Sequence, residues 1–288
     1  MDVEQTRWLV AGAGGMLGTD LVEALRARGA PVLALGRADL DVTDARQVAE
    51  RVRDVDVVVN CAAWTAVDDA ETDEASAFAL NAVGPQLLAR AARRAGARMV
   101  QVSTDYVFDG AATEPYAEDA PLAPRSAYGR TKAAGEWAVR AECPDHLVVR
   151  TAWLYGAHGP CFPKTMARLA AGRDELSVVA DQVGQPTWTT DLADLIIRLV
   201  AAGAPAGTYH GTSTGEVSWH GFTQQIVQTL GREPGMVLPT TSADFPRPAP
   251  RPAYSVLGHD ALRAAGVEPI GPWAERWAAA APAVLEGS

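Results

Sequence analysis

Five short apolar segments alternate with longer helical stretches in the first half of this chain, and this alternation restricts the folds open to it. The segments lie at residues 7–11, 31–35, 56–60, 99–103 and 146–150. Residues 16–28, 74–94 and 126–141 lie between them and carry Ala, Leu and Arg at helical spacing. Strands that are apolar throughout are buried on both faces, which is typical of a parallel sheet covered by its crossover helices. The sequence therefore predicts an α/β fold with a doubly wound parallel sheet.

The alternation is lost beyond about residue 151, where Gly and Pro occur at many positions. Such an irregular pattern favours a second, smaller unit. We expect a sheet domain over residues 1–152, to which 181–206 returns. Residues 153–180 and 207–288 would form a smaller C-terminal substrate-binding lobe, in which the Pro-rich segment 239–252 is predicted to be an extended loop.

The charge and the cysteines of the chain narrow its partners and its setting. A net charge of -10 and an isoelectric point near 5 argue against nucleic acid or an anionic membrane as partner. Cys61, Cys143 and Cys161 are odd in number and show no pairing or metal-ligand spacing, which fits a reduced, cytoplasmic setting. The first residues lack a signal-peptide profile, and no apolar run is long enough to span a bilayer. We therefore expect a small-molecule partner, no membrane and no metal.

A glycine-rich turn directly follows the first expected strand. Gly12, Gly15 and Gly18 form G-x-x-G-x-x-G, with Gly14 between them, where the strand gives way to a helix. A turn without side chains lets backbone N–H groups and the helix N-terminus approach a pyrophosphate. The spacing differs by one residue from the usual G-x-G-x-x-G, so the position at the first β–α turn supports the assignment. The sequence thus predicts a dinucleotide site, and the alternative is a turn needed only for close helix packing.

The end of the second expected strand selects the form of the dinucleotide. Arg37 lies there and would suit a 2′-phosphate, which favours NADPH. Asp39 follows closely and would bind ribose hydroxyls, so NADH use stays open. The alternative for Arg37 is a solvated surface charge.

A tyrosine and a lysine lie one helical turn apart in the stretch 126–141. Lys132 follows Tyr128 by four residues and is one of only two lysines among 25 Lys and Arg residues. Lys presents a compact charge and Arg a planar fork, so a retained Lys suggests a chemical requirement. A nearby ammonium favours the phenolate, and we therefore expect a lowered Tyr128 pKa and a general acid/base near neutral pH. The alternative is an exposed helix pair.

Longer motifs extend these features into a family resemblance. The glycine turn, Thr104 at the end of the fourth strand and Tyr128-x-x-x-Lys132 together resemble an extended short-chain dehydrogenase/reductase. Over nearly the whole chain, further motifs are similar to dTDP-4-dehydrorhamnose reductases: C-A-A-W-T-A-V-D at 61–68, S-T-D-Y-V-F-D-G at 103–110, R-T-A-W-L-Y-G at 150–156, D-Q-V-G-Q-P-T at 181–187 and R-P-A-Y-S-V-L at 251–257. One departure is Cys161, where that family usually has Asn, and it affects the expectation for the substrate pocket.

The resemblance implies a Rossmann-like NAD(P)-binding domain and a reaction. NADPH would deliver a hydride to the C4 ketone of a dTDP-4-keto-6-deoxy sugar, converting dTDP-4-dehydrorhamnose to dTDP-L-rhamnose or acting on a close deoxysugar analogue. Tyr128 would give the proton to the developing alkoxide. Lys132 would hold the nicotinamide ribose and lower the pKa of Tyr128, and Thr104 would hydrogen-bond the carbonyl oxygen.

The resemblance also implies two sets of binding residues. The cofactor set is Gly12, Gly14, Gly15, Met16, Leu17, Gly18, Arg37, Asp39, Leu40, Ala62, Ala63, Thr65, Tyr128 and Lys132. The substrate set is Val67, Asp68, Thr104, Asp105, Tyr106, Trp153, Gln182 and Arg251. Lys164 and Arg168 are, with Arg251, candidates for the substrate diphosphate or simple surface charges. Asn81 lies in a helical stretch, where Asn is unfavourable, so we expect it to make a specific buried hydrogen bond.

Three other functions remain compatible with parts of this pattern. A sugar-nucleotide dehydratase usually has Asp-Glu after the active-site Thr, whereas Asp105 is followed here by Tyr106. An epimerase would share the fold and would retain its cofactor through the cycle. A non-catalytic, NADP-binding regulatory subunit would show decay of the catalytic residues, which are intact here. The residues leave open the particular ketosugar, the stereochemistry at C4, and whether the chain forms a homodimer.

Overall fold

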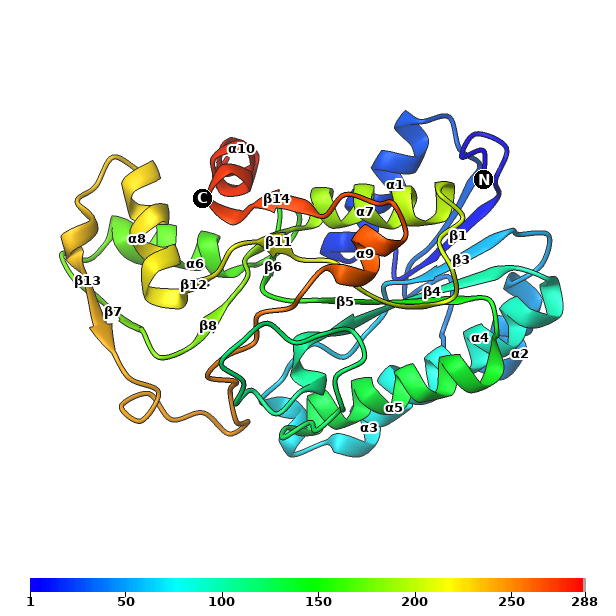
Figure 1. Ribbon diagram of the computed structural model, residues 1–288, viewed down its shortest axis with the longest axis horizontal. Coiled ribbons are helices and arrows are strands. Elements are labelled where there is room, and N and C mark those ends of the chain that lie inside the picture. The colour runs from blue at the N-terminus through cyan, green and yellow to red at the C-terminus, as the bar shows by residue number, and fades with distance from the viewer. Residues whose placement is uncertain (287–288) are drawn as a thin grey trace.

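The computed structural model describes residues 1–286, and a parallel six-stranded sheet lies at its centre (Figure 1). The strand order is β10-β5-β4-β3-β1-β2. The bounds are β1 (Trp8–Ala11), β2 (Val32–Leu35), β3 (Val57–Asn60), β4 (Arg98–Thr104), β5 (His146–Thr151) and β10 (Gly207–His210). All five predicted strands form, each with ends within one residue of those expected. The predicted doubly wound α/β fold is confirmed.

Helices cover both faces of the sheet, which explains why its strands are apolar throughout. On one face lie α1 (Met16–Ala27) and α7 (Thr189–Ala201), and on the other lie α2 (Ala45–Arg51), α4 (Gly84–Ala95) and α5 (Ala127–Glu142) (Figure 1). Successive residues of β1 alternate between the two cores: Trp8 and Val10 pack with α1 and α7, whereas Leu9 and Ala11 pack with α2 and α4.

The stretch predicted as one helix over 74–94 is interrupted. It consists of α3 (Glu74–Phe78), a π-helical turn at Ala79–Val83, and α4. Pro85 lies at the start of α4 and has no N–H for the bond that a continuous helix would make to residue 81. The expected hydrogen bonds of Asn81 are confirmed: Oδ1 accepts from Trp64 N at 2.8 Å, and Nδ2 donates to Thr131 Oγ1 at 3.0 Å. Asn81 thereby joins this turn to the loop after β3 and to α5.

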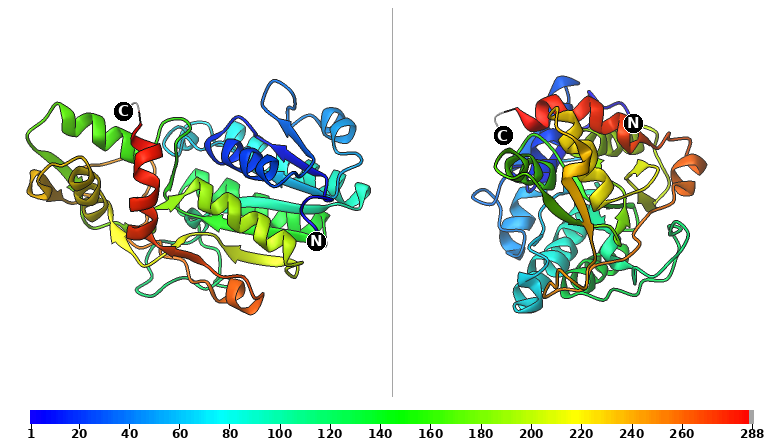
Figure 2. Two further views of the ribbon diagram at one scale, coloured as in Figure 1. Left: turned by 90° about the horizontal axis from the view of Figure 1, so that it is seen from above. Right: turned by 90° about the vertical axis from the view of Figure 1, so that its left-hand side faces the viewer.

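A smaller lobe extends from one end of the sheet, and the C-terminal helix packs in it (Figure 2). Its helices are α6 (Phe162–Ala171), α8 (Trp219–Thr229) and α10 (Trp273–Leu285). Short strand pairs lie outside the six-stranded sheet, with bounds β6 (Leu154–Tyr155), β7 (Leu176–Val179), β8 (Val183–Gly184), β9 (Thr187–Trp188), β11 (Ser213–Thr214), β12 (Val217–Ser218), β13 (Val237–Thr240) and β14 (Ile270–Pro272). One aromatic cluster, which includes Tyr155, Phe222 and Trp277, joins α6, α8 and α10.

Two expectations about the second half of the chain need correction. The Pro-rich segment 239–252 does not begin as a loop, because β13 continues to Thr240 in parallel pairing with β7. The sheet also does not end at residue 206, since β10 pairs with β5, and Leu262 and Ile270 belong to its core. The short helix α9 (Asp260–Ala264) lies in this returning part. The division into two domains stays a prediction. The pairing of β10 with β5 places residues 207–210 in the sheet, beyond the expected boundary at residue 206.

Over residues 1–286, the structure contains no helix with both the length and the apolar character needed to cross a membrane.

Candidate active site

Two adjoining cavities open where the strand order reverses. Doubly wound sheets bind ligands at such a point, outside the carboxyl ends of the strands. The Arg37 cavity has a volume of about 790 Å³ and the Tyr128 cavity about 590 Å³. Both are lined by the glycine turn after β1 and by the loop after β3, through Gly14, Gly15, Cys61, Ala62 and Ala63. The two cavities therefore form one extended site.

The glycine turn brings bare backbone to the junction of the cavities. Gly12 has a φ of +77°, and a Cβ there would lie 2.5 Å from Ala62 N, so no other residue fits. A Cβ on Gly18 would overlap the Gly12 carbonyl. No side chain caps the start of α1, which leaves its first N–H groups available. The turn has the geometry needed to bind a pyrophosphate.

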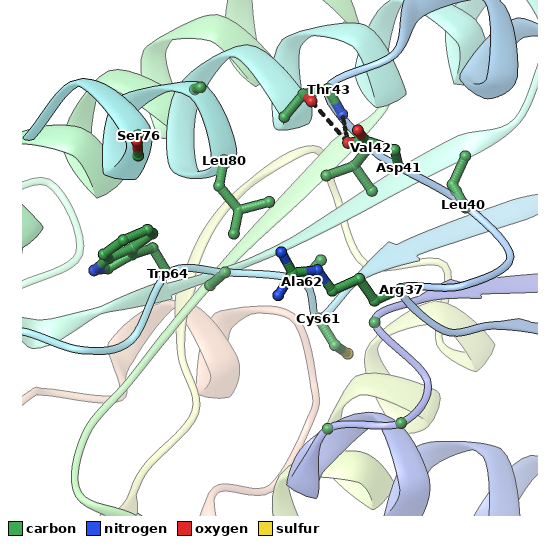
Figure 3. Close-up of a pocket in the computed structure, with 15 residues that line it drawn as sticks. Arg37, Leu40, Asp41, Val42, Thr43, Cys61, Ala62, Trp64, Ser76 and Leu80 are labelled. Carbon is green, nitrogen blue, oxygen red and sulfur yellow. Dashed lines mark hydrogen bonds between the residues drawn. The ribbon is translucent and has the colours of Figure 1, made fainter. Parts of the chain in front are cut away.

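Arg37 extends along the wall of its cavity beside Ala62, with the segment from Leu40 to Thr43 facing it (Figure 3). The Thr43 hydroxyl and N–H, with a smaller contribution from Arg37, lower the pKa of Asp41. Asp39, expected here, does not line the cavity: its Oδ2 accepts from Gly36 N at 3.0 Å within the turn. The structure thus brings Arg37 but not Asp39 to the site.

The three residues expected to be catalytic meet in the Tyr128 cavity. Thr104 ends β4, and Tyr128 and Lys132 lie on one face of α5. Ser126 begins the helix, because its Oγ accepts from Gly129 N at 3.1 Å, and this cap places Tyr128 in the first turn. Thr104 and Lys132 are 5% and 4% exposed, so both of these polar side chains are buried before any ligand binds.

The expectation of a lowered Tyr128 pKa is wrong for this structure. Burial raises the pKa of Tyr128 to about 12 and lowers the pKa of Lys132 to about 8. The Lys132 ammonium also donates to Val102 O at 2.7 Å. Burial is the largest influence on the Tyr128 pKa, and Lys132 does not lower this pKa as the spacing suggested. A phenol that keeps its proton at neutral pH is nevertheless the form that an acid in a reduction needs.

Asp105 controls where the Thr104 proton lies. Thr104 Oγ1 donates to Asp105 Oδ1 at 2.9 Å and accepts from Tyr106 N at 3.3 Å. Because a hydroxyl has one proton, Thr104 in this arrangement gives that proton to Asp105, and its hydrogen bond to a substrate carbonyl stays a prediction. Asp105 is 3% exposed, and its Oδ2 has no hydrogen-bond partner. Burial raises the pKa of Asp105 to about 6, while the nearby hydroxyls of Ser255 and Thr104 favour the ionised form.

Asp105→Asn is expected to change stability in a pH-dependent way. A carboxyl whose folded-state pKa is raised stabilises the protein below its unfolded pKa, and this contribution is lost as the pH rises through about 6. Asn is neutral at every pH, so the variant should gain about 1 kcal/mol relative to the parent between pH 5 and pH 8. Urea unfolding of both proteins at the two pH values measures this difference. Asp56→Asn, at an exposed ion pair with Arg7, is the control, and an equal stability difference at both pH values would refute the expectation.

The substrate residues expected from the resemblance divide into two groups. Val67, Thr104, Asp105, Tyr106 and Trp153 line the Tyr128 cavity, as do the cofactor residues Met16, Leu17, Gly18 and Thr65. Asp68, Gln182 and Arg251 do not line it.

The outlying residues tie the Pro-rich segment to the rest of the molecule. Asp68 Oδ1 accepts from Arg251 at 2.9 Å and from Ala249 N at 3.2 Å. Gln182 Nε2 donates to Ser242 Oγ at 2.9 Å. In this structure, the side chains of Asp68, Gln182 and Arg251 therefore bind other groups of the protein. Their direct contact with a substrate stays a prediction.

Other lining residues were missed by the sequence reasoning. In the Tyr128 cavity these include Cys61, Val102, Thr151, His158 and Pro160. The positions after β3 and β5 are at strand carboxyl ends, a signal that was available. In the Arg37 cavity, Ser76, Ala79 and Leu80 come from the interrupted helical stretch, whose path the sequence does not show.

Two side chains, Lys164 and Cys161, lie differently from what the sequence suggested. Lys164, a candidate for a diphosphate, donates to Ala157 O and Gly159 O at 2.5 and 3.2 Å and so supports the loop that carries His158. Cys161 is buried with its thiol toward Gly156 O and does not line the Tyr128 cavity, so the departure at this position lies outside the pocket wall.

No metal-ligand grouping was expected, yet Asp20, Glu23 and His158 place their ligand atoms within 4.8 Å of one another. His158 Nε2 lies 3.4 Å from Asp20 Oδ1, which makes an ion pair of the same groups when the imidazole is protonated.

Comparison with known proteins agrees with this site. The sequence model described as RmlD substrate binding domain matches residues 6–285. A dTDP-4-dehydrorhamnose reductase of Streptomyces griseus is 53% identical, over 93% of this chain and 90% of that protein. A dTDP-4-keto-6-deoxy-D-glucose reductase of Streptomyces niveus is 50% identical, over 93% of each chain.

A solved structure also superimposes on nearly the whole chain. It is the dTDP-4-dehydrorhamnose reductase of Bacillus anthracis in complex with NADP, which is 38% identical and gives a TM-score of 0.93. The superposition covers 96% of this chain and 99% of that one, so the sheet and the lobe are both shared.

Proposed function

Because this chain belongs to the RmlD substrate binding domain family, we propose that it uses NADPH to reduce the C4 ketone of a dTDP-4-keto-6-deoxy sugar. The substrate is dTDP-4-dehydrorhamnose or a close deoxysugar analogue. The observation that carries the proposal is the meeting of Thr104, Tyr128 and Lys132 in a cavity continuous with the glycine turn. The high identity to reductases that are named for such sugars supports the substrate class.

The two cavities divide the cofactor and the sugar between them. Arg37 would hold a 2′-phosphate, and the N–H groups at the start of α1 would bind the pyrophosphate. The nicotinamide end and the sugar would share the Tyr128 cavity, where bound NADPH supplies the hydride.

The proton comes from the protein. Tyr128 donates its phenolic proton to the oxygen at C4 as negative charge develops there. Lys132 stabilises the phenolate that remains, and its ammonium has two further N–H donors for ribose hydroxyls beyond the one given to Val102 O. Thr104 accepts a hydrogen bond while Asp105 is ionised, and it becomes a donor toward the substrate oxygen when Asp105 is protonated.

Consumption of NADPH by the purified protein, followed at 340 nm with dTDP-4-dehydrorhamnose and with other dTDP-4-keto-6-deoxy sugars, tests the proposal. We expect oxidation with at least one of these sugars and a preference for NADPH over NADH. Arg37→Ala is expected to reduce that preference about tenfold or more, because it removes charge-assisted hydrogen bonds to the 2′-phosphate.

The matched control for that variant is Arg53→Ala, since Arg53 is an exposed residue of the same type that does not line either cavity. No oxidation with any of the sugars, by protein that binds NADPH, would contradict the proposed reaction. An unchanged NADPH/NADH ratio in Arg37→Ala would contradict the role of Arg37 alone.

Two features of the setting stay predictions. The chain contains three free cysteines, which agrees with a reduced cytoplasmic setting without testing it. A homodimer is equally untested, and sedimentation of the purified protein measures it.

A further inference from the structure

Trp153 has an unusual backbone at the edge of the Tyr128 cavity. It lines the cavity immediately after β5, and its φ of +48° lies in the left-handed region. A bulky side chain is rarely found there, and such a conformation persists only where the surroundings enforce it. The contacts of the indole therefore indicate why the chain adopts this strained backbone conformation at Trp153.

The first enforcing contact is a stacked tryptophan from the lobe. The rings of Trp153 and Trp219 lie 3.5 Å apart between centroids, with an interplanar angle of 7°. Trp219 is the first residue of α8, which Ser218 caps by accepting from Gly221 N at 3.0 Å. Phe162 of α6 packs against Trp219 at 4.3 Å. The stack is thus held by two helices of the lobe.

The second enforcing contact is a glycine at the rim of the indole. A Cβ on Gly184 would lie 2.6 to 2.8 Å from Cε2, Cζ2 and Nε1 of Trp153, so only glycine leaves room for this ring position. Gly184 pairs with Val217 in the antiparallel β8–β12 ladder. The same ladder carries Ser218, which precedes Trp219, and one small sheet therefore positions both contacts.

We propose that Trp219 and Gly184 are positioning residues that hold the Trp153 indole against the sugar in the Tyr128 cavity. Neither residue lines that cavity, so both act through Trp153. The inference rests on the proposed function and adds to it that the lobe sets the affinity for the sugar. Arg37, by contrast, lines the other cavity, which Trp153, Trp219 and Phe162 do not line.

Steady-state kinetics of three variants test this inference. In Trp219→Leu and Gly184→Ala, we expect the KM for the dTDP-4-keto-6-deoxy sugar to rise about tenfold, with the KM for NADPH within twofold of the parent. Trp219→Phe keeps an aromatic face and should recover most of the affinity. Trp137→Phe is the control, because Trp137 is 59% exposed on α5 and lines neither cavity.

Circular dichroism reports whether the two indoles are stacked in the folded protein. Two parallel, touching indoles give an exciton couplet near 225 nm, which we expect to disappear in both Trp219 variants and to persist in Trp137→Phe. Gly184→Ala retains Trp219, so it tests the position of the Trp153 ring even if Trp219→Leu fails to fold.

The outcomes separate this inference from the proposed function. A parent enzyme that does not oxidise NADPH with the sugar would overturn both. An active parent whose sugar KM is unchanged in Trp219→Leu, or in Gly184→Ala where the former does not fold, would overturn the inference alone. An equal rise in the KM values for sugar and NADPH would also overturn it, because the effect would then be a general distortion of the site.

Discussion

Replacement of Tyr128 by Phe is expected to lower kcat for the ketosugar by about 10³-fold, within the range measured for loss of a general acid. The substitution removes one oxygen atom from a half-buried side chain that lines the reaction cavity. The rest of the ring still packs at 5.5 Å from Tyr106. The dissociation constant for NADPH should therefore stay within about twofold of the parent. Single-turnover absorbance measurements and a fluorescence titration with NADPH give the two quantities.

The matched control for this variant is Tyr116→Phe. Tyr116 Oη donates to Asp109 at 2.6 Å in a loop outside both cavities, so its loss should leave kcat near that of the parent. Retention of more than a tenth of the activity in Tyr128→Phe would assign the proton to another group. A parallel loss of NADPH binding would show instead that the ring is needed to form the site.

Replacement of Glu136 by Ala is expected to have the largest effect on folding, a loss of about 3–5 kcal/mol. The Glu136 side chain is fully buried, and its oxygens accept from Arg150 Nε and Arg150 Nη2, each at 2.9 Å. Ser103 Oγ and Arg140 Nη2 donate to the same carboxylate. Because Arg150 is 1% exposed, removal of Glu136 leaves a guanidinium in the core without its counter-charge. The free energy of unfolding in urea measures the loss.

Glu142→Ala on the same helix is the control for Glu136→Ala. Glu142 also accepts two hydrogen bonds from one arginine, Arg90, but the two side chains are 21% and 43% exposed. An ion pair open to water contributes less than about 1 kcal/mol, so the difference between the variants isolates burial. Equal losses in the two variants would show that burial of the Glu136 pair is not what stabilises it.

The Glu136 pair also has a defined pH dependence. Burial raises the pKa of Glu136, but the hydrogen bonds and the charge of Arg150 outweigh it, and the folded-state pKa lies below the ordinary value. A lowered pKa contributes stability above the unfolded value, and this contribution is lost as the pH falls through the folded-state pKa. The difference in free energy of unfolding between the parent and Glu136→Ala should accordingly become smaller at acidic pH.

The fold and much of the site could be predicted from the sequence, because each depends on patterns that are local. Apolar strands separated by helices determine a two-sided sheet, since each strand must bury both of its faces. Gly18 is required by a backbone contact with Gly12 within the same turn, and Gly12 itself has a positive φ. Tyr128 and Lys132 share a helix face whatever surrounds them, and Thr104 ends a strand that leads to the crevice.

Only the tertiary structure decided the state of these groups and the origin of their neighbours. Burial within the folded chain raises the pKa of Tyr128, whereas the spacing of four residues from Lys132 suggested a lowered one. Asp68 and Arg251 are 183 residues apart in the sequence, and the fold pairs them with each other. Trp153 stacks on a tryptophan of α8, and Gly184 leaves the space that the Trp153 ring occupies. Burial and long-range contacts form only when distant parts of the chain come together in the fold, so a pattern of adjacent residues does not predict them.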